Sequence, residues 1–434
     1  MDIKIKKIYL AIIFVSGLFT GCKRPKPYAK RVFVEEKSHI LKKRIITFTS
    51  GGGGGHVSAA RAVRTILQDN YEIADVYMLR DVLAPLDFVK QMTFEYSSAE
   101  DLYNYLITNK YVWFTNTLCD YGKYNMPLKD KKMQKLISDF LDLNPPDLMI
   151  SVMPTVNNSL LAVAKKRGIP LIIIPTDLDH SMFIIGLKDS PLTYELYRYI
   201  VPFNDPDLLK PLDPVGIPSQ RIVVGGFPIR QEFFAKKNIK KLKNDFGIPL
   251  TKPVVTVLMG AAGSSATYDY LKTLSRSKHA LHVIVCLGRN EALRKKIEKI
   301  KLPYNITMSL VGFTDKIPDI MAMSDVLISK CGTVSVMEAV HAQIPLLLDC
   351  TSRALDWEAL NVSFITQHGF GEGVTDLKKL DKLLDKYLFD REFYERCKKN
   401  LREFVKPRFA DNLKQVVVEL LVQAQSYKLA HIKN

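Results

Sequence analysis

The chain has 434 residues, of which 47% are apolar and 25% charged, and this composition excludes a disordered chain. Its length predicts two or three domains with complete hydrophobic cores. The six cysteines form no CxxC pair and have no zinc-binding spacing, which excludes a zinc module and favours reduced, buried thiols in a cytosol-facing protein.

The net charge of +17 is unevenly distributed. Residues 1–44 carry twelve Lys and Arg against three acidic residues, which places +9 at the start of the chain. Such a block attracts anionic surfaces. Because no nucleic-acid-binding signature accompanies it, we expect anionic membrane lipids as partners and no nucleic acid.

The amino-terminal segment, residues 1–43, joins a short apolar run to a basic linker. The run covers residues 8–21 and ends at Cys22, short of the roughly 20 residues that a membrane span needs. Residues 18–22 form a loose lipobox, with Phe19 where a small aliphatic residue is usual. Basic residues follow at once, and positive charge there tends to stay cytoplasmic. Three interpretations stay open: a membrane anchor that holds the chain at the cytoplasmic face, a lipoprotein signal acting through Cys22, or a fortuitous apolar start.

The first folded region begins with a pattern of strand, glycine turn and helix. Residues 44–50 predict a buried strand, the five glycines at 51–55 a turn, and residues 57–67 a helix. This order is typical of a doubly wound α/β domain, which we place at residues 44–232. Further strands are expected at residues 147–152 and 170–175, and further helices at residues 130–141 and 158–166.

The same alternation restarts after a basic linker at residues 233–252. A second α/β domain is expected at residues 253–400, followed by a C-terminal helix at residues 401–434 within a helical stretch that Pro407 breaks. The expected strands are residues 254–259, 283–287, 306–311, 326–329 and 345–348, and the expected helices are residues 291–300, 317–323 and 335–342. The predicted fold class is α/β, with two Rossmann-like domains facing a cleft and ligands at the carboxyl ends of strands.

His56 follows the glycine run and is the first candidate for a chemical role. The glycines allow positive φ and close approach of a ligand, and the helix N-terminus favours phosphate or a developing anion. No Lys-Ser/Thr pair follows, so the loop is not a P-loop, and it is no regular GxGxxG either. A neutral imidazole at this turn is suited to remove a proton from an acceptor hydroxyl. The alternative is that His56 only caps the helix.

Several motifs together resemble a known family. The run 53–56 with Ala59 and Ala60, residues 176–180 and residues 226–230 resemble the amino-terminal domain of monogalactosyldiacylglycerol synthases and processive diacylglycerol glucosyltransferases. The second half resembles the wider glycosyltransferase family 28, which includes the peptidoglycan N-acetylglucosaminyltransferase. The matching positions there are residues 286–290, 312–313, 324–325, 329–333, 338–339, Pro345, Glu358 and Asn361. The resemblance implies a GT-B fold, inversion at the anomeric carbon, a UDP-sugar as substrate, no separate cofactor and no tightly bound metal.

The candidate donor site lies in the second half. Residues 329–333 precede a helix and offer backbone N–H groups to a diphosphate. The family gives the residue matching Glu338 the role of binding ribose, and Glu358 and Asn361 share a face suited to sugar hydroxyls if that stretch is helical. The full set is Gly263, Arg289, Lys330, Gly332, Thr333, Glu338, Glu358 and Asn361.

This half also departs from the family pattern at three places. Asp356 and Trp357 replace a Gly-Gln pair, Thr333 replaces a second glycine after Lys330, and alanines stand between Gly260 and Gly263.

The candidate acceptor site lies in the first half. Gly53, Gly54, Gly55 and His180 form its expected acceptor loop, and Asp177 or Asp179 either orients His56 or acts as the base itself. The alternative is that an aspartate caps the next segment. Residues 82–117 are rich in aromatic and apolar side chains, which suits either a surface that admits a lipid or helices packed on the sheet. Basic runs at 236–243 and 294–299 add attraction to an anionic membrane.

The sequence therefore predicts a hexosyltransferase that moves sugar from a UDP-sugar to a membrane lipid, with diacylglycerol as the favoured acceptor. A polyprenyl-linked acceptor is the alternative within the same enzyme class. A degenerate, membrane-anchored protein that only binds a nucleotide or lipid is the alternative outside it, and the changed donor loops support that view.

Overall fold

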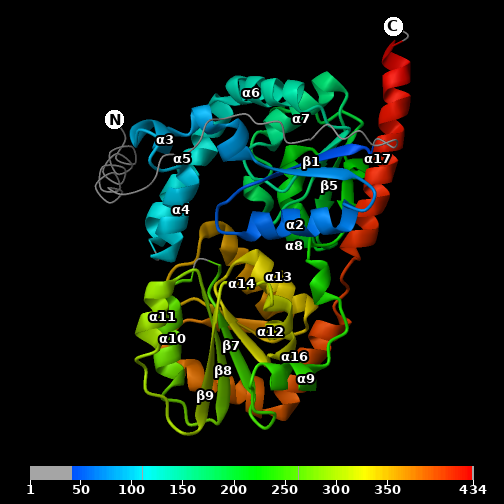
Figure 1. Cartoon of the computed structure of the whole chain (residues 1–434). Helices are drawn as coiled ribbons and strands as arrows, with labels where there is room; N and C mark the ends of the chain where they lie inside the picture. Colours follow the sequence, from blue (N-terminus) through cyan, green and yellow to red (C-terminus); the bar gives the residue numbers. More distant parts are fainter. Residues whose placement is uncertain (1–41, 110, 262, 433–434) are drawn as a thin grey trace. The chain divides into compact units, whose positions relative to one another are not determined.

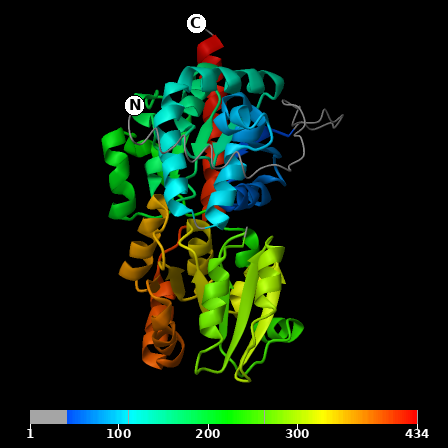
Figure 2. The same ribbon diagram turned by 90° about the vertical axis from the view of Figure 1, so that its left-hand side faces the viewer.

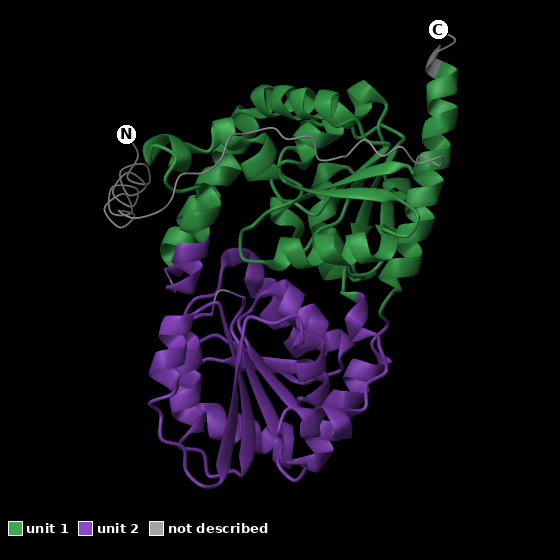
Figure 3. Ribbon diagram, viewed as in Figure 1, with its two compact units in different colours: residues 1–103, 113–230, 406–434 green, residues 104–112, 231–405 purple. Residues whose placement is uncertain are grey.

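The computed structural model describes residues 42–109, 111–261 and 263–432. The predicted anchor or signal at residues 1–41 lies outside the described residues. The chain divides into two compact units (Figure 3). Unit 1 holds the described residues of 1–103, 113–230 and 406–434, and unit 2 holds those of 104–112 and 231–405.

Unit 1 is built on a six-stranded parallel sheet in the order β2-β1-β3-β4-β5-β6. Its strands are β1 (Arg44–Thr49), β2 (Glu72–Tyr77), β3 (Leu148–Ser151), β4 (Leu171–Ile173), β5 (Tyr197–Val201) and β6 (Ile222–Val224). The chain runs outward in one direction from β1 to β2 and in the other from β3 to β6, so the strand order reverses between β1 and β3. In open sheets of this kind, ligands bind at the carboxyl ends of the strands beside the reversal.

Helices cover both faces of this sheet (Figure 1). The helices that precede residue 231 are α2 (Gly55–Leu67), α3 (Phe88–Met92), α4 (Ala99–Thr108), α5 (Val112–Leu128), α6 (Asp130–Leu143), α7 (Asn157–Arg167) and α8 (Pro206–Leu209). Apolar side chains of α6 and α7 share one core with the sheet, and those of α2 and the C-terminal helix α17 (Phe409–Ile432) share the other.

The C-terminal helix thus completes unit 1, beside which it runs in Figures 1 and 2. The segment that leads back into unit 1 packs closely against Gly226. A Cβ atom on Gly226 would lie 2.5 Å from the carbonyl oxygen of Pro407 in this segment. Gly226 also has a φ of 97°. Both the close contact and the positive φ therefore require glycine at the start of the motif at residues 226–230. Arg198 of β5 and Glu419 of α17 form an ion pair that joins helix and sheet.

Unit 2 has a second six-stranded parallel sheet, in the order β12-β11-β10-β7-β8-β9. Its strands are β7 (Val254–Leu258), β8 (Leu281–Gly288), β9 (Ile306–Gly312), β10 (Val326–Ser329), β11 (Leu346–Asp349) and β12 (Gly371–Val374). Its helices are α9 (Ile239–Asp245), α10 (Ala266–Leu274), α11 (Glu291–Ile297), α12 (Ile317–Met323), α13 (Thr333–His341), α14 (Ala359–Gln367), α15 (Leu380–Leu384) and α16 (Arg391–Glu403). Here the strand order reverses between β7 and β10.

The predicted α/β class and its two parallel sheets are confirmed. The predicted break near Pro407 also exists, since α16 ends at Glu403 and α17 begins at Phe409. Strands β2, β5, β6 and β12 were not predicted. In the part of the chain that the structure describes, no helix combines the length and the apolar character that crossing a membrane requires.

Candidate active site

The glycine loop of unit 1 lies at the reversal between β1 and β3. It follows β1 and leads into α2, whose N-cap is Gly54. Gly53 and Gly54 have φ values of 72° and 86°, which only glycine adopts without strain. No side chain caps α2, so the N–H groups of its first turn are left for backbone, solvent or ligand.

His56 is the second residue of α2, and its ring is held by groups from two other strands. Its Nδ1 atom lies 2.9 Å from the carbonyl oxygen of Val152, just after β3, and 2.8 Å from Oγ1 of Thr176, beyond the end of β4. Because a carbonyl oxygen can only accept, Nδ1 carries the proton. The lone pair of the neutral ring therefore sits on Nε2, the nitrogen that can accept a proton from a substrate.

The protonation state of His56 follows from its surroundings. Burial lowers the pKa of the imidazole to about 4, while the hydrogen bond to Val152 acts in the opposite direction. His56 is therefore neutral at physiological pH. A neutral, oriented histidine at a glycine turn can act as a general base, which is the role that the sequence predicts for it.

The structure places the residues at 177–180 in different environments. Asp179 accepts a hydrogen bond from the backbone N–H of Ser181 at 2.8 Å and caps a short 3-10 helix, His180–Met182. Asp177 is partly exposed. His180 is fully buried against Tyr199, with ring centroids 5.6 Å apart, and burial lowers the pKa of its imidazole to about 4. In this structure His180 belongs to the core of unit 1 rather than to an exposed acceptor loop.

A carboxylate that no sequence pattern indicated holds the glycine loop. Oε1 of Glu100, on α4, accepts hydrogen bonds from Oγ of Ser50 at 2.6 Å and from the N–H of Gly51 at 2.8 Å. Thr176 and Val152 were likewise not assigned roles. Thr176 was within a recognised motif, but neither Glu100 nor Val152 belongs to any pattern that a single sequence reveals.

In unit 2, two loops meet at the reversal between β7 and β10. The first follows β7 and contains Gly260 and Gly263, with φ values of 88° and 77°. The second follows β10 and leads through Gly332 into α13. A Cβ atom on Gly260 would lie 3.5 Å from Cε of Lys330, so the two loops touch. Gly263 is equally confined, since its Cβ would lie 2.1 Å from the carbonyl oxygen of Leu287.

Lys330 and Glu358 form an ion pair across the second loop. Nζ of Lys330 lies 2.5 Å from Oε1 of Glu358, whose side chain is only 10% exposed. Glycine at position 332 makes room for this pair, because a Cβ there would lie 2.7 Å from Nζ of Lys330. Glu358 precedes α14 and is engaged with the lysine in this structure, which is a different contact from the sugar hydroxyls expected of it.

Asn361 holds the same loop through hydrogen bonds of its side chain. Its Nδ2 atom donates to the carbonyl oxygen of Cys331 at 2.6 Å and lies 2.9 Å from Oγ1 of Thr333. The side chain is fully buried. Thr333, where the family has a second glycine, begins α13 and takes part in this support, and the N-cap Gly332 has a φ of −68° that any residue adopts. The loop is therefore closed and well bonded despite its altered sequence.

The remaining predicted donor residues lie around these loops. Glu338 is on α13 and 5% exposed. Arg289 follows β8, and its guanidinium carbon lies 3.6 Å from the centre of the Phe313 ring. Its backbone N–H bonds to the carbonyl of Ala261, which ties it to the first loop. Within residues 42–109, 111–261 and 263–432, no three His, Cys, Asp or Glu side chains form a group suited to a metal ion.

Comparison with known proteins bears on unit 2 most directly. Residues 254–415 match the family model described as "Glycosyltransferase family 28 C-terminal domain". That match covers unit 2 from β7 onward and extends into the start of α17.

Two curated relatives match across both units. Monogalactosyldiacylglycerol synthase 1 of Arabidopsis thaliana is 23% identical over 359 residues, which cover 79% of this chain and 64% of the plant protein. The chain thus spans less than two thirds of that relative's length. The processive diacylglycerol beta-glucosyltransferase of Bacillus thuringiensis is 22% identical over 396 residues, which cover 88% of this chain and 94% of the bacterial enzyme.

Solved structures share the fold. MurG of Acinetobacter baumannii superposes with a TM-score of 0.57 at 15% identity, over 88% of this chain and 99% of its own. The glycosyltransferase SnogD of Streptomyces nogalater gives 0.53 at 16% identity, over 87% of this chain and 100% of its own. A UDP-GlcNAc 2-epimerase from Neisseria meningitidis gives 0.51 at 14% identity, over 88% of this chain and 100% of its own, so the fold alone does not define a transferase. The family match is more specific: residues 254–415 match a glycosyltransferase family 28 C-terminal domain, whose homologues are hexosyltransferases, and the chain has the GT-B fold.

Proposed function

We propose that the protein transfers a hexose from a UDP-sugar to the hydroxyl group of a membrane lipid, with diacylglycerol as the acceptor. The observation that carries this proposal is the different chemistry of the two strand-order reversals. One presents a neutral histidine with an available Nε2, and the other presents a lysine beside a helix N-terminus. The curated relatives, which are named for diacylglycerol as acceptor, support the choice of lipid.

The donor is assigned to unit 2. The N–H groups of the first turn of α13 and the ammonium group of Lys330 would hold the diphosphate and stabilise its charge as it leaves, without a tightly bound metal ion. Glu338, further along α13, would accept hydrogen bonds from the ribose hydroxyls. When Lys330 turns to the diphosphate, the carboxylate of Glu358 is released from its ion pair and can accept hydrogen bonds from the sugar.

The acceptor is assigned to unit 1. Nε2 of His56 takes the proton of the lipid hydroxyl as its oxygen attacks the anomeric carbon. The new bond joins that oxygen to the anomeric carbon, the bond to the β-phosphate oxygen breaks, and UDP departs with inversion. Val152 and Thr176 hold Nδ1 and so keep Nε2 directed at the acceptor. This arrangement assigns orientation of His56 to those two groups.

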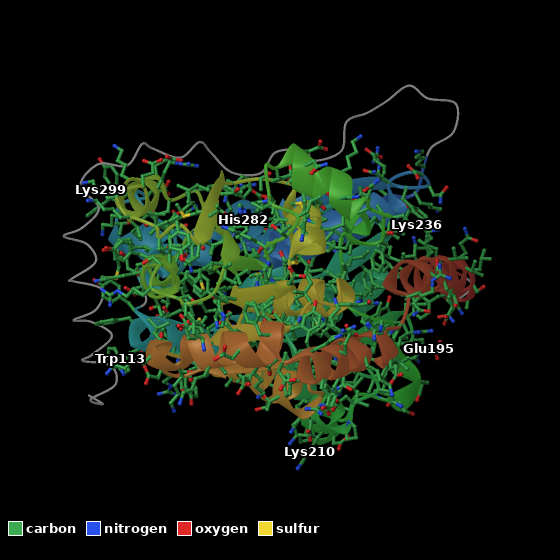
Figure 4. The ribbon with its side chains drawn as sticks, turned by 90° about the horizontal axis from the view of Figure 1, so that it is seen from below. Trp113, Glu195, Lys210, Lys236, His282 and Lys299 are labelled. Carbon is green, nitrogen blue, oxygen red and sulfur yellow. The ribbon has the colours of Figure 1, made fainter. Side chains whose placement is uncertain are left out.

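Exposed apolar side chains between residues 92 and 128 suit a membrane surface. The most exposed is Phe94, at 87%, and it sits with Glu95 in a turn where both residues have positive φ. Such strain in non-glycine residues is typical of functional segments. The other exposed large side chains of this stretch are Met92, Tyr96, Tyr111, Trp113, Tyr124 and Leu128, of which Figure 4 labels Trp113.

The basic runs make a smaller contribution to this membrane assignment. Lys236 and Lys299, one from each run in unit 2, lie far apart in Figure 4, so the runs do not form one patch. Each lysine near an anionic surface is worth about 1 kcal/mol. We therefore assign the main lipid contact to the exposed apolar stretch, with anionic lipids as a secondary attraction, and place the enzyme at the cytoplasmic face where nucleotide-sugars occur.

The test is a product assay. The purified full chain is incubated with radiolabelled UDP-glucose or UDP-galactose and vesicles of phosphatidylglycerol and phosphatidylcholine with and without diacylglycerol, and lipid products are identified by mass spectrometry. A hexosyl-diacylglycerol that requires added diacylglycerol supports the proposal. UDP binding by calorimetry with no glycolipid from any lipid would overturn it and favour a protein that only binds its ligands.

A further inference from the structure

The carboxylate of Glu100 occupies the place on the glycine loop where a ligand anion would bind. Backbone N–H groups of such loops commonly donate to phosphate oxygens. Here the N–H of Gly51 donates to Oε1 of Glu100 at 2.8 Å instead. The same oxygen accepts from Oγ of Ser50 at 2.6 Å, and that hydroxyl oxygen accepts from the N–H of Gly52 at 3.1 Å. One carboxylate therefore engages the first half of the loop.

Glu100 is the second residue of α4, and the start of this helix is fixed by hydrogen bonds. The buried side chain of Asp87 accepts hydrogen bonds from the N–H groups of Val89 and Lys90 in α3 and from that of Ala99, the first residue of α4. Asp87 thus fixes the start of α4 one residue before Glu100. Tyr103, one turn further on, packs against the loop, since a Cβ on Gly52 would lie 3.3 Å from its ring.

Burial is the main influence on the Glu100 carboxyl and raises its pKa, while the hydrogen bonds from Ser50 and Gly51 and the charge of Arg80 act in the opposite direction. Arg80 interacts with Glu100 electrostatically, but its guanidinium is bonded to Asp81, with contacts of 2.7 and 3.1 Å. A second anion at the glycine loop would meet the negative charge of the Glu100 carboxylate and would compete with it for an N–H group that is already engaged.

We propose that Glu100 determines acceptor specificity by occupying the anion position of the glycine loop, so that the enzyme accepts an uncharged lipid alcohol and rejects acceptors that carry a diphosphate. This inference rests on the proposed function and deepens it. It names the group that separates diacylglycerol from a polyprenyl diphosphate acceptor. Glu100 does not touch the reacting atoms in this assignment and acts only on what can approach His56.

The first experiment measures anion binding and needs no turnover. The full chain is saturated with UDP to fill the donor site, and inorganic pyrophosphate is titrated by calorimetry into wild type, Glu100→Gln and Asp101→Asn. Glu100→Gln keeps the shape and an accepting oxygen but removes the charge. Asp101→Asn removes the same charge from the adjacent residue, whose carboxylate bonds Ser98 and not the loop. We expect pyrophosphate to bind Glu100→Gln roughly tenfold or more tightly than the other two proteins.

The second experiment compares acceptors. For wild type and Asp101→Asn, kcat/KM with diacylglycerol should exceed that with a polyprenyl diphosphate sugar, and in Glu100→Gln this ratio should fall roughly tenfold or more. Thermal unfolding is followed for each protein, and Glu100→Ala replaces Glu100→Gln if the latter does not fold. Equal pyrophosphate affinity in wild type and the Glu100 variants, or a wild type that uses both acceptors equally, would overturn the inference. If no protein makes glycolipid, the proposed function fails, and the titration still decides the role of Glu100.

Discussion

The two strand-order reversals share their architecture but differ in their chemistry. Each has a glycine-containing loop that leads from a central strand toward a helix, and each is closed by an acidic side chain from elsewhere in its unit. In unit 1 that side chain is Glu100, bonded to backbone and a hydroxyl. In unit 2 it is Glu358, bonded to the ammonium group of Lys330.

The difference assigns separate parts of the proposed reaction to the two units. In unit 1 the carboxylate is bonded to one backbone N–H group and one hydroxyl, which offer no full positive charge, so this loop suits a neutral alcohol and the neutral His56. In unit 2 the ammonium group of Lys330 can exchange the carboxylate of Glu358 for a diphosphate, because the lysine keeps its positive charge when its partner changes. Under the proposed function, the same position in the fold serves proton transfer in one unit and charge stabilisation in the other.

Replacing His56 should have the largest effect on activity, because it removes the group that distinguishes unit 1 from unit 2. In His56→Ala we expect kcat to fall by about 10²- to 10⁴-fold, because general-base catalysis contributes that much. The affinity for UDP should stay within about twofold, since donor binding is assigned to unit 2. Initial rates of glycolipid formation and calorimetry with UDP measure the two quantities.

His282 provides a matched control for this change. It is a buried histidine of unit 2, labelled in Figure 4, and burial lowers the pKa of its ring to about 4 as in His56. Both of its nitrogens are engaged, by Thr307 at 2.9 Å and Ser309 at 3.1 Å. His282→Gln should leave kcat within about threefold of wild type once folded protein is counted. Wild-type turnover in His56→Ala would remove His56 from the mechanism.

Neutralising Lys330 should produce the next largest effect, this time on binding. Lys330→Gln removes a charge-assisted hydrogen bond worth about 1.5–3 kcal/mol, so UDP should bind about 10- to 150-fold more weakly. The measurement is the dissociation constant of UDP by calorimetry.

A double variant separates loss of the ligand contact from damage to the loop. Lys330→Gln alone leaves the buried carboxylate of Glu358 without its cation, which destabilises the fold. Lys330→Gln/Glu358→Gln removes both charges and should recover thermal stability without recovering UDP affinity. Full recovery of affinity in the double variant would show that Lys330 only neutralises Glu358 and does not contact the diphosphate.

Much of the fold could be predicted because its central strands are mostly apolar and buried. Strand β10, predicted at residues 326–329, has those bounds, and α12 also has its predicted bounds. Strand β12 was missed because its sequence contains two glycines. Gly371 is needed there, since a Cβ would lie 1.9 Å from the carbonyl oxygen of Leu346 on the neighbouring strand. That requirement comes from sheet packing, which a local pattern does not reveal.

The candidate site could be predicted only where its residues adjoin a strand end. His56 follows β1 through a run of glycines, and Lys330 follows β10 directly, two residues before Gly332, so the local signal was visible in both cases. The partners of His56 lie 96 and 120 residues away, and Glu100 lies 50 residues from Ser50. Sheet order brings them together, so the sequence alone offered the neighbouring Asp177 and Asp179 as partners instead. The sequence suggested that Glu358 and Asn361 bind sugar hydroxyls, but it did not indicate that both also hold the loop that follows β10.

Asn361 allows a smaller test of the unit 2 loop. Asn361→Asp cannot donate to the carbonyl oxygen of Cys331, a contact of 2.6 Å in a fully buried site. An unsatisfied buried group costs about 1–3 kcal/mol, so the unfolding temperature should fall and UDP should bind roughly three- to tenfold more weakly. Asn144→Asp is the control, because Asn144 is a buried asparagine of unit 1 that donates to Phe140. It should lose stability and keep UDP affinity, and equal loss of affinity in both variants would contradict a local role for Asn361.

The smallest expected effect is on the pH dependence of kcat, which should be flat near neutral pH and which nevertheless identifies the catalytic base. A general base with an ordinary histidine pKa of 6.5 is only about one tenth neutral at pH 5.5, whereas one with a pKa of about 4 is about 97% neutral there. We therefore expect kcat at pH 5.5 to stay within about twofold of its value at pH 7 and to fall only as the pH approaches 4.

The stability of the folded protein must be measured over the same pH range. Folding lowers the pKa of His56 and His180, so the stability that their neutral forms provide is complete above pH 6.5 and is lost as the pH falls from 6.5 toward 4. With rates corrected for the folded fraction by circular dichroism, a tenfold loss of kcat by pH 5.5 would mean that the catalytic base is a solvated group rather than the half-buried ring of His56.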